Sequence, residues 1–282
     1  VTLDGKKALE FSVAPDGDPW LALFSRSARR GEAKSFKISG RPLIPESVNL
    51  ANAIDLAGWY ADVYGESAQG DNADWEKRGD EIFSRKLKPE DRAGNPYGGR
   101  RRFNLNVYSE VEDAPEPPAL RTWRESVLQY HRPLFEDGVI AYEFFYDPGK
   151  AMVHPALDRL AFLIEPDGVA THWLTDAPHD RSGLAPDNRD VDRSIRRGPA
   201  APPLKAHAWN QVAIEVKGDV ATIRLNGVEV AQRTLEPSNQ RTFGLFHYPE
   251  LSEVRVRRVV MRGAWPRTPP RSADLNPPTT SK

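Results

Sequence analysis

The chain contains no cysteine among its 282 residues. Disulfides, zinc–thiolate sites and thiol nucleophiles are therefore excluded, although the cellular compartment is not fixed by this absence. An excess of one charge sign is also missing, because 39 Lys and Arg stand against 40 Asp and Glu and the formal net charge is -1. No global field attracts nucleic acid or an anionic membrane, so binding to either would need a local patch, and we expect no nucleic-acid partner.

Long apolar runs are missing as well. No stretch approaches the roughly 18 to 20 residues of a membrane span, and the chain shows no signal peptide. We therefore expect a soluble protein without a membrane span. The chain begins at Val1 without a methionine, which favours a processed protein or a piece of a longer one. Phosphate-cradling glycine loops, a G-x-S-x-G elbow and nucleotide fingerprints are absent too.

The segment from Trp209 to Arg233 gives the clearest fold signal. Apolar and polar residues alternate through two runs separated by Gly218-Asp219, and Asn226-Gly227 follows the second run. Asn-Gly suits a two-residue hairpin turn, because both central residues of that turn take positive φ angles. The pattern predicts an antiparallel meander, and a second run of strands is expected from Thr242 to Trp265.

Strand patterns recur along most of the chain, whereas convincing helices are scarce. Val139 to Asp147 is the most β-prone run, and because both of its faces are apolar we predict a central strand. Hairpins are predicted around Arg78-Gly79-Asp80 and Pro166-Asp167-Gly168. Further strands are expected at Ala8 to Val13, Trp20 to Phe24, Ser35 to Ser39, Gly58 to Tyr64 and Glu125 to Tyr130.

Two polar stretches, Lys88 to Arg102 and Asp176 to Pro203, are predicted to be loops. A loop as long as the second tends to be functional or disordered. The last residues are rich in Pro, Ser and Thr and are predicted to form a linker or tail. We divide the chain into an N-terminal β segment at 1–57, a main β domain at 58–265 and a proline-rich tail at 266–282.

Several of these segments resemble a known class of domain. The similarity to concanavalin-like, or laminin G-like, jelly-roll domains lies in WNQVAIEVKGDVATIRLNGVEV from Trp209, HRPLFEDGVIAYEFFYDPG from His131 and GLFHY from Gly244. The resemblance is strongest to a domain of unknown function from large exported bacterial proteins, and it extends to the 3-keto-disaccharide hydrolase family. It covers about Trp75 to Trp265.

The resemblance implies an all-β fold, a two-sheet antiparallel jelly-roll (concanavalin A-like) sandwich with long loops and few helices. Ligands of such domains, where they bind any, occupy the concave face of a sheet and its bordering loops. An exported, periplasmic or cell-surface location is implied as well. The resemblance does not select an activity, because this fold carries lectins, glycoside hydrolases, lyases and spacer modules alike.

Glu143 stands within the apolar central strand and is the first candidate for chemistry. Side chains alternate along a strand, so Glu143, Phe145 and Asp147 should share one face. Hydrolases of this fold carry alternating carboxylates on a concave strand, but Phe145 stands at the position of the second one. Glu143 is therefore either a catalytic acid or base or the ion-pair partner of an arginine such as Arg159 or Arg132.

Histidines and their aromatic and charged neighbours form the second group of candidates. We expect several of them to lie on strands beside the central strand and to share one surface with Glu143. His172 is a second candidate acid or base near neutral pH. The histidines lack the tight spacing of transition-metal motifs. The ligand-binding candidates are His131, Arg132, Arg159, Trp173, Asp176, His179, His247 and Tyr248.

The run DNRDVD offers oxygen ligands of the kind that calcium accepts, in Asp187, Asp190 and Asp192. The glycine and distal glutamate of an EF-hand loop are missing, so an ordinary polar loop is the alternative. If an ion binds here we expect a structural calcium, and no other cofactor is predicted.

These residues support three functional hypotheses. The preferred one is a carbohydrate-recognising module that binds glycan on its concave face around Glu143 by aromatic stacking and charged hydrogen bonds. The second is a glycoside-active enzyme, a keto-sugar hydrolase or lyase, that uses Glu143 or a neighbouring histidine. The third is a structural or assembly module of a larger exported protein or complex, with protein partners instead of a small ligand.

Overall fold

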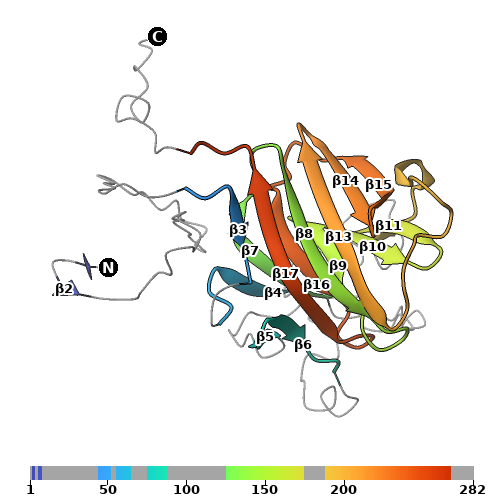
Figure 1. Cartoon of the computed structure of the whole chain (residues 1–282), viewed down its shortest axis with the longest axis horizontal. Coiled ribbons are helices and arrows are strands. Elements are labelled where there is room, and N and C mark those ends of the chain that lie inside the picture. The colour runs from blue at the N-terminus through green and yellow to red at the C-terminus, as the bar shows by residue number, and fades with distance from the viewer. Residues whose placement is uncertain are drawn as a thin grey trace, which may run out of the picture.

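The computed structural model describes residues 2–3, 6–7, 44–51, 55–64, 75–87, 125–174 and 188–267. Two antiparallel sheets form a sandwich (Figure 1), and the helical structure in these ranges is one 3-10 turn, η1 (Arg193–Ile195). A separate pair joins β1 (Thr2–Leu3) to β2 (Lys6–Lys7). No helix in the described ranges has the length and apolar character needed to cross a bilayer.

The eight-stranded sheet faces the viewer in Figure 1. Its strands lie in the order β15 (Val228–Thr234), β14 (Val220–Leu225), β13 (Ala208–Lys217), β8 (Gly138–Tyr146), β17 (Val254–Gly263), β6 (Glu81–Ser84) and β5 (Trp75–Arg78), and β3 (Ser47–Asn49) also pairs with β17. Strand β8 has a neighbour on each side, which confirms the prediction of a central strand.

The seven-stranded sheet lies behind the first. Its strands lie in the order β12 (Arg189–Asp190), β11 (Gly168–Trp173), β10 (Leu160–Glu165), β9 (His154–Leu157), β16 (Thr242–His247), β7 (Glu125–Pro133) and β4 (Trp59–Tyr64). The chain passes from β7 in the seven-stranded sheet to β8 in the eight-stranded sheet and returns to the seven-stranded sheet for β9 to β12. It then crosses to the eight-stranded sheet for β13 to β15, returns for β16 and crosses once more for β17. This connectivity confirms the two-sheet antiparallel jelly roll.

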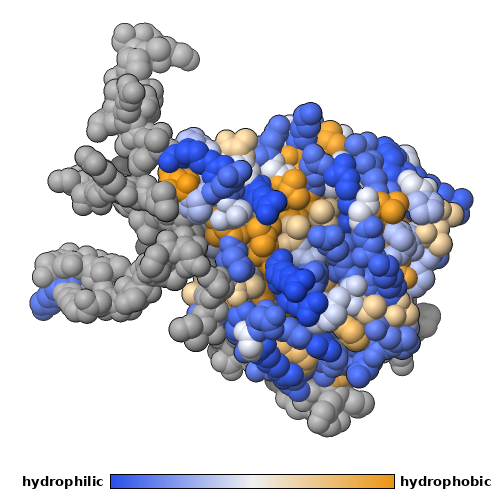
Figure 2. All heavy atoms as spheres, in the orientation of Figure 1, coloured by the Kyte–Doolittle hydropathy of each residue, from blue (hydrophilic) through white to orange (hydrophobic). Residues whose placement is uncertain are grey.

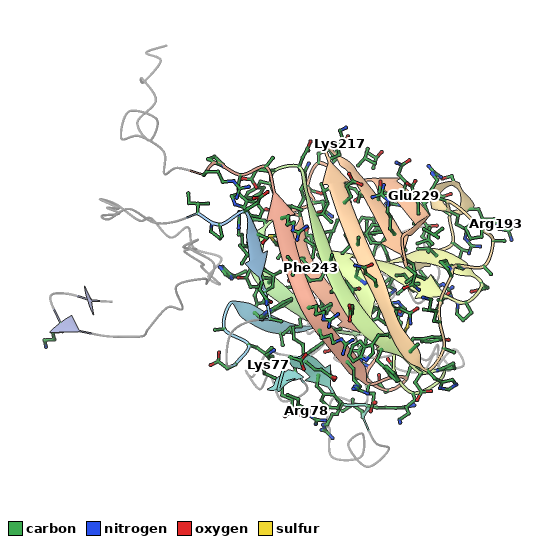
Figure 3. All side chains as sticks on the ribbon, in the orientation of Figure 1. Lys77, Arg78, Arg193, Lys217, Glu229 and Phe243 are labelled. Atoms are coloured by element: carbon green, nitrogen blue, oxygen red, sulfur yellow. The ribbon has the colours of Figure 1, made fainter. Side chains whose placement is uncertain are left out.

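The main core fills the space between the sheets. Tyr142 and Phe144 of β8 are both buried, as the alternation along the strand predicts. They meet residues of the other sheet: the ring centroid of Phe243 on β16 lies 5.8 Å from that of Tyr142, and the label of Phe243 in Figure 3 lies over the middle of the sandwich. Charged residues such as Lys217 and Arg193 lie at the periphery in the same view.

The predicted turns occur where the sequence placed them. Strands β13, β14 and β15 form the meander, with Gly218 and both Asn226 and Gly227 at positive φ. Strands β10 and β11 form a hairpin in which Glu165 pairs with Gly168, and β5 and β6 form one in which Arg78 pairs with Glu81. Tight turns rich in Gly, Asn and Asp thus set the strand register.

The end of the N-terminal segment joins the sandwich. Strand β3 pairs with β17, with Val48 opposite Met261, and Val48 is buried. Trp59 Nε1 donates to the carbonyl of Leu50 at 2.7 Å, and Trp265 Nε1 donates to that of Pro45 at 2.9 Å. Residues 44–51 therefore pack with the sandwich, while the division of the chain at residue 57 stays a prediction.

Several predicted segments lie outside the described residues. They are the strands at 8–13, 20–24 and 35–39, the loop at 88–102, the first half of the loop at 176–203, and most of the tail at 266–282. The second half of the long loop contains β12 and η1, with Ile195 buried, so part of it is ordered against the sandwich.

Gly244 of β16 is closely packed against the side chains of the two adjacent strands in the seven-stranded sheet. A Cβ at this position would lie 2.9 Å from Val127 Cγ2 and 3.4 Å from Ala156 Cβ, on the two adjacent strands. We therefore expect Gly244→Ala to lower the free energy of unfolding by about 1–3 kcal/mol. Chemical denaturation measures it, with the exposed Gln211→Ala on β13 as a control expected within about 0.5 kcal/mol of the wild type. Equal stability of the Gly244→Ala protein would contradict this.

Candidate functional site

The outer face of the seven-stranded sheet is concave. Strand β11 lies three positions from β16 and four from β7, which on a flat sheet means about 14 and 19 Å. The rings of His172 on β11 and Phe246 on β16 nevertheless stack with centroids 5.3 Å apart. Glu125, at the start of β7, also reaches His172. These contacts require the sheet to curve toward its outer side.

Three side chains on this concave face form a hydrogen-bonded series, which we call the triad. The distance between Glu125 Oε1 and His172 Nε2 is 2.6 Å, and that between His172 Nδ1 and the Tyr248 hydroxyl is 3.3 Å. The side chain of His172 is 1 % exposed and that of Glu125 is 12 % exposed, while Tyr248 is partly exposed. The triad thus has a buried middle, and Oε2 of Glu125 is buried as well, so Tyr248 is the end that reaches the surface.

Hydrogen-bonding capacity places the protons of the triad for a neutral His172 beside an ionised Glu125. An ionised carboxylate only accepts hydrogen bonds, so Nε2 of His172 carries the proton that it donates to Glu125. Nδ1 then has a free lone pair and accepts from the hydroxyl of Tyr248. The order along the triad is therefore hydroxyl, imidazole and carboxylate.

Small and apolar side chains surround the triad on the concave face. Phe246 stacks on His172 and makes an edge contact with Tyr248, with ring centroids 4.9 Å apart, and so supports two members of the triad. Dry surroundings strengthen the electrostatic interactions within such a group. The cluster consists of Val127, Ala156, Ala161, Leu163, Ala170, Leu174 and Phe246, with Tyr248 packed against it.

An ion pair borders this cluster. Arg189 of β12 stands opposite His172 in the strand register and pairs with Glu165 of β10. Burial raises the pKa of Glu165, and the opposing attraction of Arg189 is the smaller effect. The concave face therefore combines aromatic rings with charged hydrogen-bonding groups.

Two buried histidines near the triad are held neutral. His154 Nδ1 accepts the backbone N–H of Ile164 at 3.1 Å, and burial, followed by the charges of neighbouring groups, lowers its pKa to about 3. His247 lies between the sheets, 3.0 Å from both the Ser84 hydroxyl and the Ser252 carbonyl, and burial lowers its pKa to about 4. Both act as structural hydrogen-bonding groups.

Glu143 lies on the outer face of the other sheet, so the expectation that it shares a surface with the histidines was wrong. Its carboxylate accepts from Arg257 Nε and Arg258 Nη1, both at 2.8 Å. Burial raises the pKa of Glu143, but the two arginines outweigh this and the net pKa is lowered. An ionised carboxylate has no proton to donate as a general acid. The ion-pair alternative is right, although the partners are not Arg159 or Arg132.

A β-bulge in β17 explains this double pairing. Arg258 has φ 54°, and the register against β8 shifts between Arg257 and Val260. The extra residue turns two consecutive side chains toward the same outer face. Arg257 also covers the ring of Trp209, with its guanidinium carbon 4.0 Å from the ring centroid. This face is largely hydrophilic in Figure 2.

Four other predicted residues take no part in the triad. Trp173 and His247 point into the core between the sheets rather than onto the concave face, so the predicted common surface with Tyr248 was wrong for them. His131 and Arg132 lie six and seven residues from the start of β7, about 20 Å along the strand. Arg132 is buried there with its guanidinium carbon 4.1 Å above the ring of Trp265.

Of the remaining ligand-binding candidates, Arg159 lies in the turn between β9 and β10. Arg159 Nε donates to the carbonyl of Leu174, and the Leu174 N–H returns a bond to the carbonyl of Arg159. These bonds anchor the end of β11 next to the concave face. Asp176 and His179 lie outside the described residues.

In the part of the chain that the structure describes, the predicted calcium ligands do not form a common site. Asp190 pairs with Thr171 in β12, whereas Asp192 caps η1 by accepting from the Ser194 N–H at 2.8 Å. Asp187 lies outside the described residues. Within the described ranges no group of three or more His, Asp or Glu could hold a metal. A calcium ion here stays a prediction.

Sequence reasoning missed Glu125 and Phe246. Glu125 was expected only as the first residue of a strand, and Phe246 only as part of the GLFHY run. A strand pattern assigns each side chain to one of two faces, but it gives no distance between strands that are far apart in the chain. A glutamate at the start of an otherwise buried strand was the available signal for Glu125.

These features define a two-sheet jelly-roll sandwich with a polar triad on the concave face of one sheet. Residues 120–268 match the family described as "Domain of unknown function (DUF1583_N)", and the chain belongs to that family. Residues 1–75 match a second description, "Protein of unknown function (DUF1581)". The comparison with curated protein sequences gives no match.

Solved structures similar to this chain are sandwiches of low identity. Carbohydrate binding module CBM66 from Bacillus subtilis is 12 % identical over 49 % of this chain and 82 % of its own, with a TM-score of 0.34. A putative glycosyl hydrolase from Parabacteroides distasonis ATCC 8503 is 12 % identical over 78 % and 94 %, with a TM-score of 0.38. The VIP36 exoplasmic/lumenal domain is 9 % identical over 78 % and 92 %, with a TM-score of 0.43. At these scores the similarities carry no argument about ligands.

The two neutral histidines make the stability of the sandwich depend on pH. Their folded-state pKa values lie below the ordinary 6.5, so the unfolded chain binds more protons between pH 6.5 and about 4. We expect the free energy of unfolding to fall on acidification in this window by about 1.4 kcal/mol per pH unit for each histidine. Denaturant unfolding at a series of pH values measures this slope.

The variant His154→Gln isolates one histidine, because a glutamine oxygen can accept the Ile164 N–H in place of Nδ1. We expect its slope to be lower than that of the wild type by about 1.4 kcal/mol per pH unit in this window. Its stability at pH 7.5, where His154 is neutral, controls for the loss of packing. An unchanged slope would show that His154 is not held neutral.

Proposed function

We propose that the chain is a carbohydrate-binding module whose glycan site is the concave face of the seven-stranded sheet beside Tyr248. The observation that carries this proposal is the triad. Glu125, His172 and Tyr248 come from three separate parts of the chain and converge on the side of the sheet that faces away from the main core. Packing of the sandwich does not require polar groups there, whereas a binding site does.

The chemistry of the triad suits a sugar ring. Sugars present C–H faces to aromatic rings and hydroxyl groups to charged acceptors and donors. Tyr248, which is partly exposed, supplies a ring and a hydroxyl. The net charge of -1 gives no long-range attraction for a polyanion, which favours a neutral glycan. An exported location, which the family resemblance implies, is part of this proposal.

A glycan array followed by calorimetry on the bound glycan tests the site. We expect Tyr248→Ala to weaken binding about tenfold or more, because the change removes both a ring contact and a hydroxyl. Glu143→Gln is the matched control, since Glu143 is a partly exposed carboxylate on the opposite sheet, and its affinity should equal that of the wild type.

Two results would contradict the proposed site. The first is an array on which the folded wild-type protein binds no glycan. The second is an affinity that Tyr248→Ala leaves unchanged, since the glycan would then lie elsewhere. Far-UV circular dichroism and the unfolding midpoint of each variant establish that a loss of binding does not come from unfolding.

A further inference from the structure

We propose that the outer face of the eight-stranded sheet is a dimer interface, on which a second copy of this chain packs about a two-fold axis along β8. An apolar row crosses the middle of this face. Ala141 of β8 pairs with Ala213 of β13 on one side and with Val260 of β17 on the other, and all three are partly exposed. Val139 extends the row along β8, and Figure 2 shows apolar surface where β17 runs beside β3. We call these four residues the apolar patch.

Charged and polar residues surround the apolar patch. Glu215 on β13 and Arg262 on β17 flank Val139 in the strand register. Strand β3 presents Ser47 and Asn49, which are both exposed. An apolar centre with a polar rim is the usual anatomy of a protein–protein interface. Short side chains on a sheet surface also allow a second sheet to pack closely on it.

The two flanks of β8 are complementary to each other, which assigns this surface to a second copy. Half a turn about the line of β8 exchanges the flanks, so residues of β13 in one copy face residues of β17 in the other. Glu215 and Arg262 stand at the same level, because both are opposite Val139. Glu215 of each copy therefore faces Arg262 of the other, and Ala213 faces Val260. A two-fold interface requires this self-complementarity.

The charges at the interface can all be satisfied. Arg262 is exposed, and no residue in the described ranges forms an ion pair with it. Glu215 pairs with Arg224 in its own chain, but a carboxylate has two oxygens and can accept from a second guanidinium. Glu143 would face its own copy at the rim, and it is already paired with two arginines. No unpaired carboxylate is therefore buried between the copies.

The size of the surface sets the expected affinity. It spans β13, β8 and β17, with β3 at one end of β17 and β6 at the other. Four strands about 4.8 Å apart, over about eight residues at about 3.3 Å each, cover about 500 Å² in each copy. The two copies together bury about 1,000 Å², at the lower end of specific interfaces. We therefore expect a reversible dimer with a Kd of about 1–10 μM.

Dimerisation through this face would direct the two seven-stranded sheets away from each other. Each concave face would stay open, because it lies on the far side of its own sandwich. A consequence that rests on the proposed function is that one dimer holds two glycans on opposite sides and cross-links them.

Sedimentation velocity of the full chain, without glycan and over about 1–100 μM, tests the interface. We expect the wild-type protein to pass from monomer to dimer in this range. Arg262→Glu and Glu215→Arg each place like charges across both contacts and should each weaken dimerisation about tenfold or more. A mixture of the two variants should form a heterodimer of about wild-type affinity, because one copy is then basic and the other acidic at both positions.

Glu229→Arg is the matched control for the charge reversal. Glu229 is a charge partner of Arg224, as Glu215 is, and its side chain is 37 % exposed against 38 % for Glu215. It lies on β15, two strands beyond β13 and outside the apolar patch (Figure 3). Its dimerisation should equal that of the wild type.

Three results would overturn the dimer. A folded wild-type protein that stays monomeric at about 100 μM would leave the patch to another protein or to a segment of this chain outside the described residues. Dimerisation that either single variant leaves unchanged would place the contact elsewhere. Single variants that do not associate when mixed would refute the two-fold arrangement. Because no glycan is present, none of these results bears on the proposed glycan site.

Discussion

The small side chains on the outer face of the seven-stranded sheet allow the curvature on which the site depends. Gly244 and Ala156 lie so close across β16 and β9 that even one added methyl group would meet its neighbours. On this curved sheet, the side chains of Glu125 on β7 and His172 on β11, four strand positions apart, come within hydrogen-bond distance of each other. A flat sheet would leave Glu125 and His172 separated by the width of three strands. Curvature therefore brings the members of the triad together.

The opposite sheet shows how a polar cluster can be stable without a site. Glu143, Arg257 and Trp209 satisfy one another through ion pairs and a cation–π contact, and the bulge at Arg258 completes the arrangement. Every member there is engaged by a fixed partner, and the net effect on Glu143 is a lowered pKa. The triad differs because it lies on the side of its sheet that faces away from the main core and brings together residues of β7, β11 and the turn after β16.

Much of the fold was predictable from local patterns, because turns and alternation act over a few residues. Asn226-Gly227 predicted a hairpin turn, and the apolar run around Tyr142 predicted a central strand, and the structure has both. The site was less predictable. Alternation correctly set Glu143 and Tyr142 on opposite faces, but it could not assign Val139 to Asp147 and His172 to different sheets. The partner of His172, Glu125, is 47 residues away in the sequence, and only the curved sheet brings them together.

Burial of the triad sets a further condition on its use. An imidazole that gains a proton in a dry place is costly unless a carboxylate lies beside it, and Glu125 supplies that charge. Removing the carboxylate would leave His172 able to hold its ring in place by stacking on Phe246, but unable to carry charge at low cost. Stacking on Phe246 and the hydrogen bond to Glu125 are therefore separate contributions to holding the same side chain in place.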